Sequence, residues 1–122
     1  MQFQEKSAIY RQIAEFGIDQ VLEKEWSVGE RIPSVRQLAA EVGVNANTVM
    51  QSYRWLEEQG IIINQRGRGF YVADSGLTKA TDIRKQDFIE AILPRISHDL
   101  KLLGISTQEL IELLNNYQKQ QA

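Results

Sequence analysis

Apolar side chains recur at three- and four-residue intervals through the first part of the chain, which is the spacing of an amphipathic helix. The first such stretch spans residues 7–25, and its apolar face carries Ile9, Ile13, Phe16 and Val21. Gly17 lies inside the stretch and costs roughly 1 kcal/mol of helix propensity relative to alanine. We expect this helix to cover the core formed by the elements that follow it.

The next pattern predicts a short helix that begins just after Pro33 and ends before Gly43. Ser34 is a candidate N-cap, and Gln37 three positions later completes a capping-box pattern. The apolar face of this helix carries Val35, Leu38, Ala39 and Val42. Gly43 can adopt the positive φ that a sharp turn into a further helix requires.

A second short helix is expected from Ala46 to about Gln59, with Asn45 as its N-cap and Gly60 as its stop signal. Its buried face would carry Val49, Tyr53 and Leu56, and its opposite face carries Asn47, Gln51 and Arg54. Two short helices joined by a tight turn form a helix-turn-helix, whose second helix typically enters the major groove of DNA. Amide side chains on that helix can pair with adenine, so this face is chemically suited to reading bases.

Two short runs of β-branched and aromatic residues, 61–63 and 69–72, predict a β-hairpin after the second helix. The tip between them contains two glycines and two arginines, over residues 65–69. A hairpin that follows a recognition helix is a wing. Arg66 and Arg68 would then lie against the sugar-phosphate backbone or reach into the minor groove.

The last third of the chain shows a different pattern. A polar linker is expected over residues 75–81, followed by a helix over residues 82–103 that Pro94 should bend near Glu90. Gly104 would end this helix, and a Ser106-initiated capping box would begin the last one. The two helices share an apolar stripe made of Ile89, Ile92, Ile96, Leu100, Leu103, Leu110, Leu113, Leu114 and Tyr117. The final residues, 118–122, are expected to fray.

Together these patterns predict a mainly α-helical fold with one small β-hairpin. Residues 1–74 form a winged helix-turn-helix, residues 75–81 a linker, and residues 82–122 a two-helix dimerisation segment. Two helices of this size do not enclose a pocket of the ~300 Å³ that a drug-sized ligand typically needs. Their apolar stripes are therefore expected to pair with the same helices of a second chain.

Composition narrows the classes of function. The chain has no cysteine and a single histidine, His98, and no nucleophile, base and orienting group stand in a recognisable arrangement. We therefore expect no enzyme activity, no metal site and no cofactor. The sequence has no apolar signal segment at its start and no apolar run of about 20 residues, so we expect a cytoplasmic protein without membrane association.

The net charge of the chain is −2, which is low for a nucleic-acid-binding protein. The distribution of charge is more informative than the total. Residues 31–73 carry five arginines, at positions 31, 36, 54, 66 and 68, against Glu41, Glu57 and Glu58. The predicted helix-turn-helix and wing are therefore locally positive, as binding to phosphates requires.

Residues 9–72 resemble the N-terminal winged-helix domain of the GntR-type bacterial transcription regulators. The resemblance rests on Ile9 to Ile13, Gly29 to Ala39, Val44, Asn47 to Val49, Tyr53 to Glu57, Gly60 to Ile62 and Arg66 to Val72. It implies that Ser34, Arg36, Thr48 and Gly67 touch operator DNA. Position 46 departs from the family, because Ala46 stands where an arginine is common, and one base contact is therefore expected to be missing.

The residues and the resemblance together give the expected DNA interface, which consists of Ser34, Arg36, Asn45, Ala46, Asn47, Thr48, Gln51, Arg66, Gly67 and Arg68. The short two-helix tail is similar to that of the YtrA subfamily of GntR regulators, which implies dimerisation. A homodimer would place two recognition helices about one DNA turn (~34 Å) or a multiple apart, so the expected partner is a palindromic double-stranded operator. A small-molecule effector of unknown identity is left open.

The competing interpretation is a winged helix that serves as a protein-interaction or RNA-binding module without sequence-specific DNA binding. Met50 and Trp55 favour it, because exposed apolar and aromatic side chains are typical of protein interfaces. The arginines and asparagines on one face favour DNA. The two readings differ in salt dependence, since phosphate contacts weaken steeply as salt is added.

Overall fold

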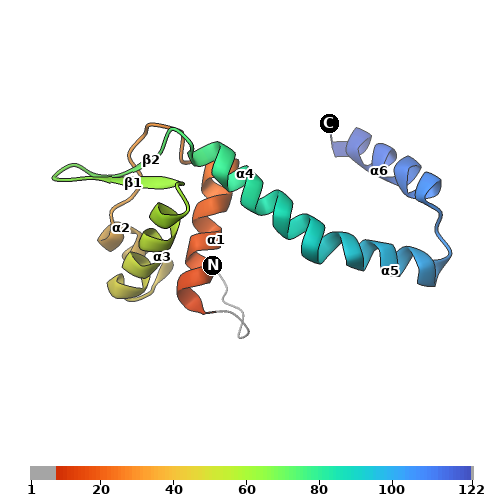
Figure 1. Cartoon of the computed structure of the whole chain (residues 1–122), viewed down its shortest axis with the longest axis horizontal. Helices are drawn as coiled ribbons and strands as arrows, with labels where there is room; N and C mark the ends of the chain where they lie inside the picture. Colours follow the sequence, from red (N-terminus) through yellow and green to blue (C-terminus); the bar gives the residue numbers. More distant parts are fainter. Residues whose placement is uncertain (1–7, 122) are drawn as a thin grey trace. The chain divides into compact units, whose positions relative to one another are not determined.

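The computed structural model describes residues 8–121, which form six α-helices, a π-helical turn and a two-stranded antiparallel hairpin (Figure 1). In chain order the elements are α1 (Ile9–Leu22), α2 (Val35–Val42), α3 (Ala46–Glu58), β1 (Ile62–Gln65), β2 (Gly69–Val72), α4 (Gly76–Asp87), η1 (Phe88–Ile92), α5 (Leu93–Leu103) and α6 (Thr107–Gln121). The predicted mainly α-helical fold with a winged helix-turn-helix is confirmed. None of the described helices has the length and apolar character needed to cross a membrane.

Helices α1 and α2 both pack against α3, and Figure 1 shows α1 lying beside α3. The buried core between them includes Ile13, Ile18, Leu38, Val49, Tyr53 and Leu56. Gly17 lies at the crossing of α1 and α3, where a Cβ atom would stand 2.9 Å from Leu56 Cδ1 and 3.2 Å from Trp26 Cζ3. The glycine that weakens the helix pattern in the sequence therefore permits a close helix contact.

Helix α1 is shorter than the predicted span of 7–25, and residue 7 lies outside the described residues. It ends at Leu22 because Lys24 takes a positive φ of 62°. The backbone amides of Glu25 and Trp26 then both donate to the Gln20 carbonyl, at 2.9 and 3.0 Å. This turn brings the Trp26 ring into the core, edge-on to the rings of Phe16 and Tyr53.

The two hairpin strands pair in register, with Ile62 opposite Val72 and Gln65 opposite Gly69. A third backbone segment lies along the other edge of β2. Ile32 donates to the Phe70 carbonyl at 2.9 Å, and Val72 donates to the Glu30 carbonyl at 3.0 Å. The connection between α1 and α2 thus holds the base of the wing.

The structure differs from the sequence prediction at residues 75–81, where we expected a linker. Helix α4 occupies this region and packs onto the winged helix, with Gly76 and Ala80 buried. A Cβ atom at Gly76 would stand 2.6 Å from the Ile61 carbonyl oxygen, so only glycine allows this approach. The boundary between the two compact units falls between Ile83 and Arg84, inside a helix rather than in a loop.

In the second unit we expected a bend near Glu90, and the structure has the π-helical turn η1 at this place. Pro94 lacks a backbone N–H and cannot bond the carbonyl four residues earlier, which disrupts regular α-helix at this place. Gly104 ends α5 with a φ of 67°, and Ser106 Oγ accepts a 3.0 Å hydrogen bond from the Glu109 amide at the start of α6. The fraying expected at residues 118–122 is not seen as far as Gln121, since α6 extends to that residue.

Candidate nucleic-acid interface

The N-terminus of α2 is fixed by the predicted capping box. Ser34 Oγ accepts a 3.1 Å hydrogen bond from the Gln37 amide, and Gln37 Oε1 accepts one of 2.8 Å from the Ser34 amide. Ser34 and Gln37 are only three positions apart in the sequence, so this cap forms without contacts from the rest of the chain. Arg36, in the first turn of the helix, is exposed.

The turn between α2 and α3 follows the predicted chemistry. Gly43 has a φ of 73°, and its amide donates to the Ala39 carbonyl at 2.9 Å. Asn45 Oδ1 then accepts a 2.8 Å hydrogen bond from the Asn47 amide and caps α3. These bonds set where the recognition helix begins and which side chains it presents first.

Helix α3 is amphipathic in the predicted sense. Val49, Tyr53 and Leu56 are buried, whereas Asn47, Gln51 and Arg54 are exposed on the opposite face. Ala46 and Thr48 at its N-terminus are partly buried. The helix therefore presents an amide- and guanidinium-bearing surface while its other face is held by the core.

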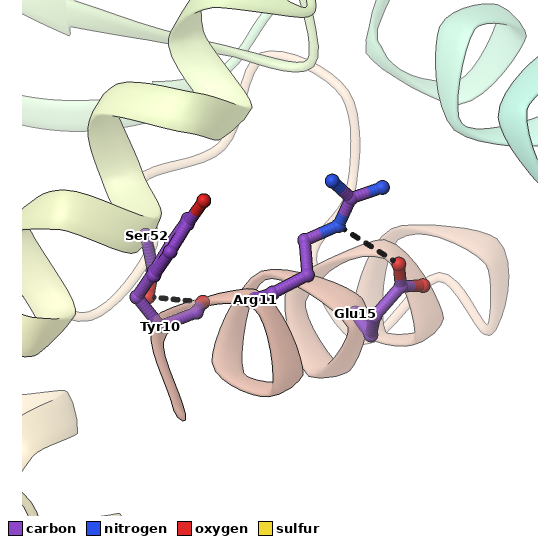
Figure 2. Close-up of polar contacts among 4 residues, drawn as sticks. All are labelled: Tyr10, Arg11, Glu15 and Ser52. Atoms are coloured by element: carbon purple, nitrogen blue, oxygen red, sulfur yellow. Dashed lines mark hydrogen bonds and ion pairs between the residues drawn. The ribbon is translucent and has the colours of Figure 1, made fainter. Parts of the chain in front are cut away.

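Two hydrogen bonds that the sequence did not reveal orient α3. Buried Ser52 donates from Oγ to the Tyr10 carbonyl of α1 at 2.6 Å (Figure 2) and lies 3.0 Å from the Thr48 carbonyl. The hydroxyl of fully buried Tyr53 donates to the Pro33 carbonyl at 2.6 Å. Each bond joins α3 to a distant segment, so no local pattern in the sequence could have identified it.

Burial raises the pKa of the Tyr53 hydroxyl well above its ordinary value, and the negative charge of Glu41 adds to the effect. Both causes disfavour the tyrosinate. Tyr53 is therefore a neutral hydrogen-bond donor over the whole physiological pH range. Ionisation therefore does not remove its bond to Pro33 in this range.

A shallow hollow of about 210 Å³ lies over the second half of α3 and the start of α1. It is lined by Tyr10, Gln51, Arg54, Trp55 and Glu58. Beside it, the Arg11 guanidinium carbon stands 4.1 Å from the centroid of the Trp55 ring, and Arg11 Nε lies 3.3 Å from Glu15 Oε1 (Figure 2). Trp55 thus packs against its own chain through a cation–π contact instead of forming an open apolar surface.

The wing tip is a tight turn in which the Arg68 amide donates to the Gln65 carbonyl at 2.8 Å. Gly67 has a φ of 78°, a conformation that L-residues rarely adopt. Arg66 and Arg68 on either side of it are exposed. Within residues 8–121, neither these two guanidinium groups nor that of Arg36 forms an ion pair or hydrogen bond.

All ten residues predicted for the DNA interface lie in the compact unit that ends at Ile83. Seven are exposed, and Ser34, Ala46 and Thr48 are partly buried. They come from the N-termini of α2 and α3 and from the wing tip, so one folded unit carries all three groups. No set of three or more histidine, aspartate or glutamate side chains within the described residues is arranged to hold a metal ion.

Comparison with known proteins identifies the family to which this unit belongs. Residues 9–72, more than half of the chain, match the profile of the family described as "Bacterial regulatory proteins, gntR family". The chain therefore belongs to the GntR family. It is a helix-turn-helix transcriptional regulator that binds DNA through the winged helix.

The resemblance extends beyond the winged helix. The chain is 31% identical over 116 residues to the uncharacterized HTH-type transcriptional regulator YhcF of Bacillus subtilis, covering 95% of this chain and 94% of that protein. It is 34% identical over 104 residues to the HTH-type transcriptional repressor YtrA of the same organism, covering 85% and 79% respectively. The crystal structure of a putative GntR-family regulator from Bacteroides thetaiotaomicron is similar with a TM-score of 0.78 and 37% identity, covering 94% of this chain and all of that one.

Proposed function

We propose that the protein is a homodimeric repressor that acts in the cytoplasm on a palindromic DNA operator. The exposed N-terminal half of α3 would lie in the major groove, with Asn45, Asn47 and Gln51 reading bases. Arg36 and Ser34 at the start of α2, and Arg66 to Arg68 at the wing tip, would hold the backbone. The amphipathicity of α3 carries this proposal, because one face is locked in the core and the other is free and polar.

The electrostatics of the interface support this arrangement. The exposed guanidinium groups of Arg36, Arg66 and Arg68 have no carboxylate partner within residues 8–121. Unpaired arginines can neutralise phosphates without first breaking an ion pair, and each phosphate contact releases condensed counterions. The N-terminus of α3 adds backbone amides and a positive helix dipole, which also favour an anion.

The second unit supports dimerisation. None of residues 84–121 is buried in the single chain, although α5 and α6 carry many large apolar side chains. Six members of the predicted stripe are exposed, namely Ile89, Ile92, Leu103, Leu113, Leu114 and Tyr117, and the other three are partly buried. Covering each half-exposed side chain is worth roughly 1 kcal/mol. A second copy of the same helices offers a matching apolar stripe in a twofold arrangement.

The assignment as a repressor is supported by the similarity to the YtrA repressor, which covers 85% of this chain and 79% of that protein and therefore includes part of the C-terminal unit. The palindromic operator follows from the dimer. Two identical reading surfaces related by a twofold axis match two identical half-sites in opposite orientation.

The experiment is a selection of bound duplexes from a random DNA pool with the full-length protein, followed by sedimentation of the protein alone and with the selected duplex. We expect an inverted repeat, a dimer in free solution and one dimer per duplex. Selected sequences without twofold symmetry, or a monomer that binds one half-site at full affinity, would contradict the proposal. Enrichment of no sequence at all would instead favour a protein or RNA partner.

A further inference from the structure

The base of the wing carries a third arginine that the sequence did not associate with the hairpin. Arg31 belongs to the connection between α1 and α2, and its backbone forms an isolated antiparallel bridge with Tyr71 of β2. The flanking hydrogen bonds of Ile32 to Phe70 and of Val72 to Glu30, described above, enclose this pair. Side chains at such a non-hydrogen-bonded pair approach each other closely, so Arg31 is fixed on the same face of the hairpin as Tyr71.

The side chain of Arg31 runs diagonally from Tyr71 to Gly69. A Cβ atom at Gly69 would stand 2.9 Å from Arg31 Nε, 3.2 Å from Arg31 Nη2 and 3.4 Å from Arg31 Cζ. The Nε–Nη2 edge of the guanidinium therefore lies beside Gly69, in space that the side chain of any other residue would fill. Because Gly69 directly follows the wing turn, the side chain of Arg31 extends from the base of the wing and places its charge near the tip.

This guanidinium is exposed and has no charged partner. Arg31 forms neither an ion pair nor a side-chain hydrogen bond within residues 8–121. Arg66 and Arg68, at the turn that Gly69 closes, are unpaired as well. Two of these arginines lie on the hairpin turn and the third on the segment paired with β2. Their positive charges repel one another, and an anion beside them would relieve this repulsion.

We propose that Arg31 is a phosphate-contacting residue of the operator interface, held by Gly69 so that its guanidinium meets the DNA backbone beside the wing. This inference rests on the proposed placement of the wing tip against DNA. Arginine is suited to this position because its guanidinium has five N–H donors, so the edge beside Gly69 leaves others free to donate to a phosphate oxygen. The residue lies 38 positions before Gly69 in the sequence, and only the pairing of residues 30–32 with β2 brings the two together.

The test compares Arg31→Ala, Arg31→Lys and the wild-type protein in operator binding at several salt concentrations. Removing one phosphate contact lowers the slope of log affinity against log salt by about 0.9 per protomer. The same relation gives roughly fivefold weaker binding per protomer at 0.15 M salt. The affinity for a non-operator duplex should fall by the same factor, because phosphate contacts carry no base information. Arg31→Lys keeps the charge and should keep most of the slope.

The matched control is Arg95→Ala, which removes an exposed arginine from α5 in the other unit and should leave the slope unchanged. Thermal unfolding of each variant separates binding from folding. An unchanged salt slope in Arg31→Ala would overturn the inference. If the melting temperature of that variant also fell, Arg31 would be assigned to the stability of the wing instead. If the wild-type protein itself shows no salt-dependent operator binding, the proposed DNA-binding function is wrong. The same experiment thus distinguishes that result from a failure of the Arg31 inference alone.

Discussion

The Tyr53 hydroxyl donates a 2.6 Å hydrogen bond to the Pro33 carbonyl, which joins the middle of the recognition helix to the residue before the α2 cap. Tyr53 is fully buried and packs edge-on against Trp26 and Phe70, with ring centroids 6.3 and 5.0 Å away. One side chain thus connects α3, the α1–α2 connection and the wing. The relative placement of the three segments that we propose face DNA depends on this contact.

Tyr53→Phe keeps the ring contacts and removes only the hydroxyl. We expect a loss of about 1–2 kcal/mol in the free energy of unfolding, because the Pro33 carbonyl loses its partner. Urea denaturation at neutral pH measures this difference. Equal stability of the two proteins would show that water replaces the hydroxyl at no cost.

The same pair of proteins predicts a pH dependence. The folded-state pKa of Tyr53 is raised by burial, so above the ordinary tyrosine pKa of about 10 the unfolded chain loses a proton that the folded chain retains. The stability that Tyr53 contributes is therefore complete below pH 10 and is lost as pH rises above it. The advantage of wild type over Tyr53→Phe should shrink in that range, and Tyr10, Tyr71 and Tyr117, present in both proteins, cancel in the comparison.

The substitution Gly17→Ala has two opposite effects on stability, one through helix propensity and one through packing. Alanine gains about 1 kcal/mol of helix propensity over glycine, but its Cβ would stand 2.9 Å from Leu56 Cδ1 in a filled core. Overpacking typically costs about 1–3 kcal/mol, so we expect a net loss of about 1 kcal/mol on denaturation. Ala40→Gly at an exposed position of α2 calibrates the propensity term, and a net gain in Gly17→Ala would mean that the Leu56 side chain moves aside freely.

Asn45→Asp separates capping from DNA binding. Aspartate is as good an N-cap as asparagine and favours the helix dipole, so the stability of the fold should be kept. Its carboxylate would enter the major groove between the two phosphate backbones, and because like charges repel we expect operator affinity to fall by about tenfold or more. Asn45→Ala is the complementary variant, with about 1 kcal/mol lower stability and no added charge. Undiminished affinity in Asn45→Asp would remove the N-terminus of α3 from the interface.

Adjacent residues of α5 give a sharp test of the dimer. Leu102 and Leu103 are 70% and 71% exposed in the single chain, but only Leu103 belongs to the predicted stripe. Leu103→Glu should shift sedimentation toward monomer and weaken binding to a palindrome. Leu102→Glu carries the same change in charge and volume and should remain a dimer. Equal behaviour of the two variants would contradict the proposed pairing surface.

Locally determined features were predictable from the sequence. The Ser34 and Asn45 caps, the Gly43 turn and the hairpin each depend on side chains within a few residues of one another. The first part of α4, residues 76–81, was not recognised as helix. Its contact with the core uses Gly76, Leu77 and Ala80, followed by Ile83, and this apolar face is weak in the sequence because two of its members are small and the residues between are mostly polar. The roles of Ser52, Tyr53 and Arg31 depend on partners 20 or more residues away, which only the folded chain brings into contact.

Operator binding by Arg36→Ala is the most direct test of whether the exposed surface of α2 and α3, with the wing, docks on DNA. Arg36 is exposed and unpaired within residues 8–121, so its removal should leave the fold and the dimer intact. A dimer carries the change twice, and at roughly fivefold per lost phosphate contact at 0.15 M salt the affinity for the selected operator should fall about 25-fold. Wild-type affinity in a folded, dimeric Arg36→Ala protein would show that DNA is bound by a different surface.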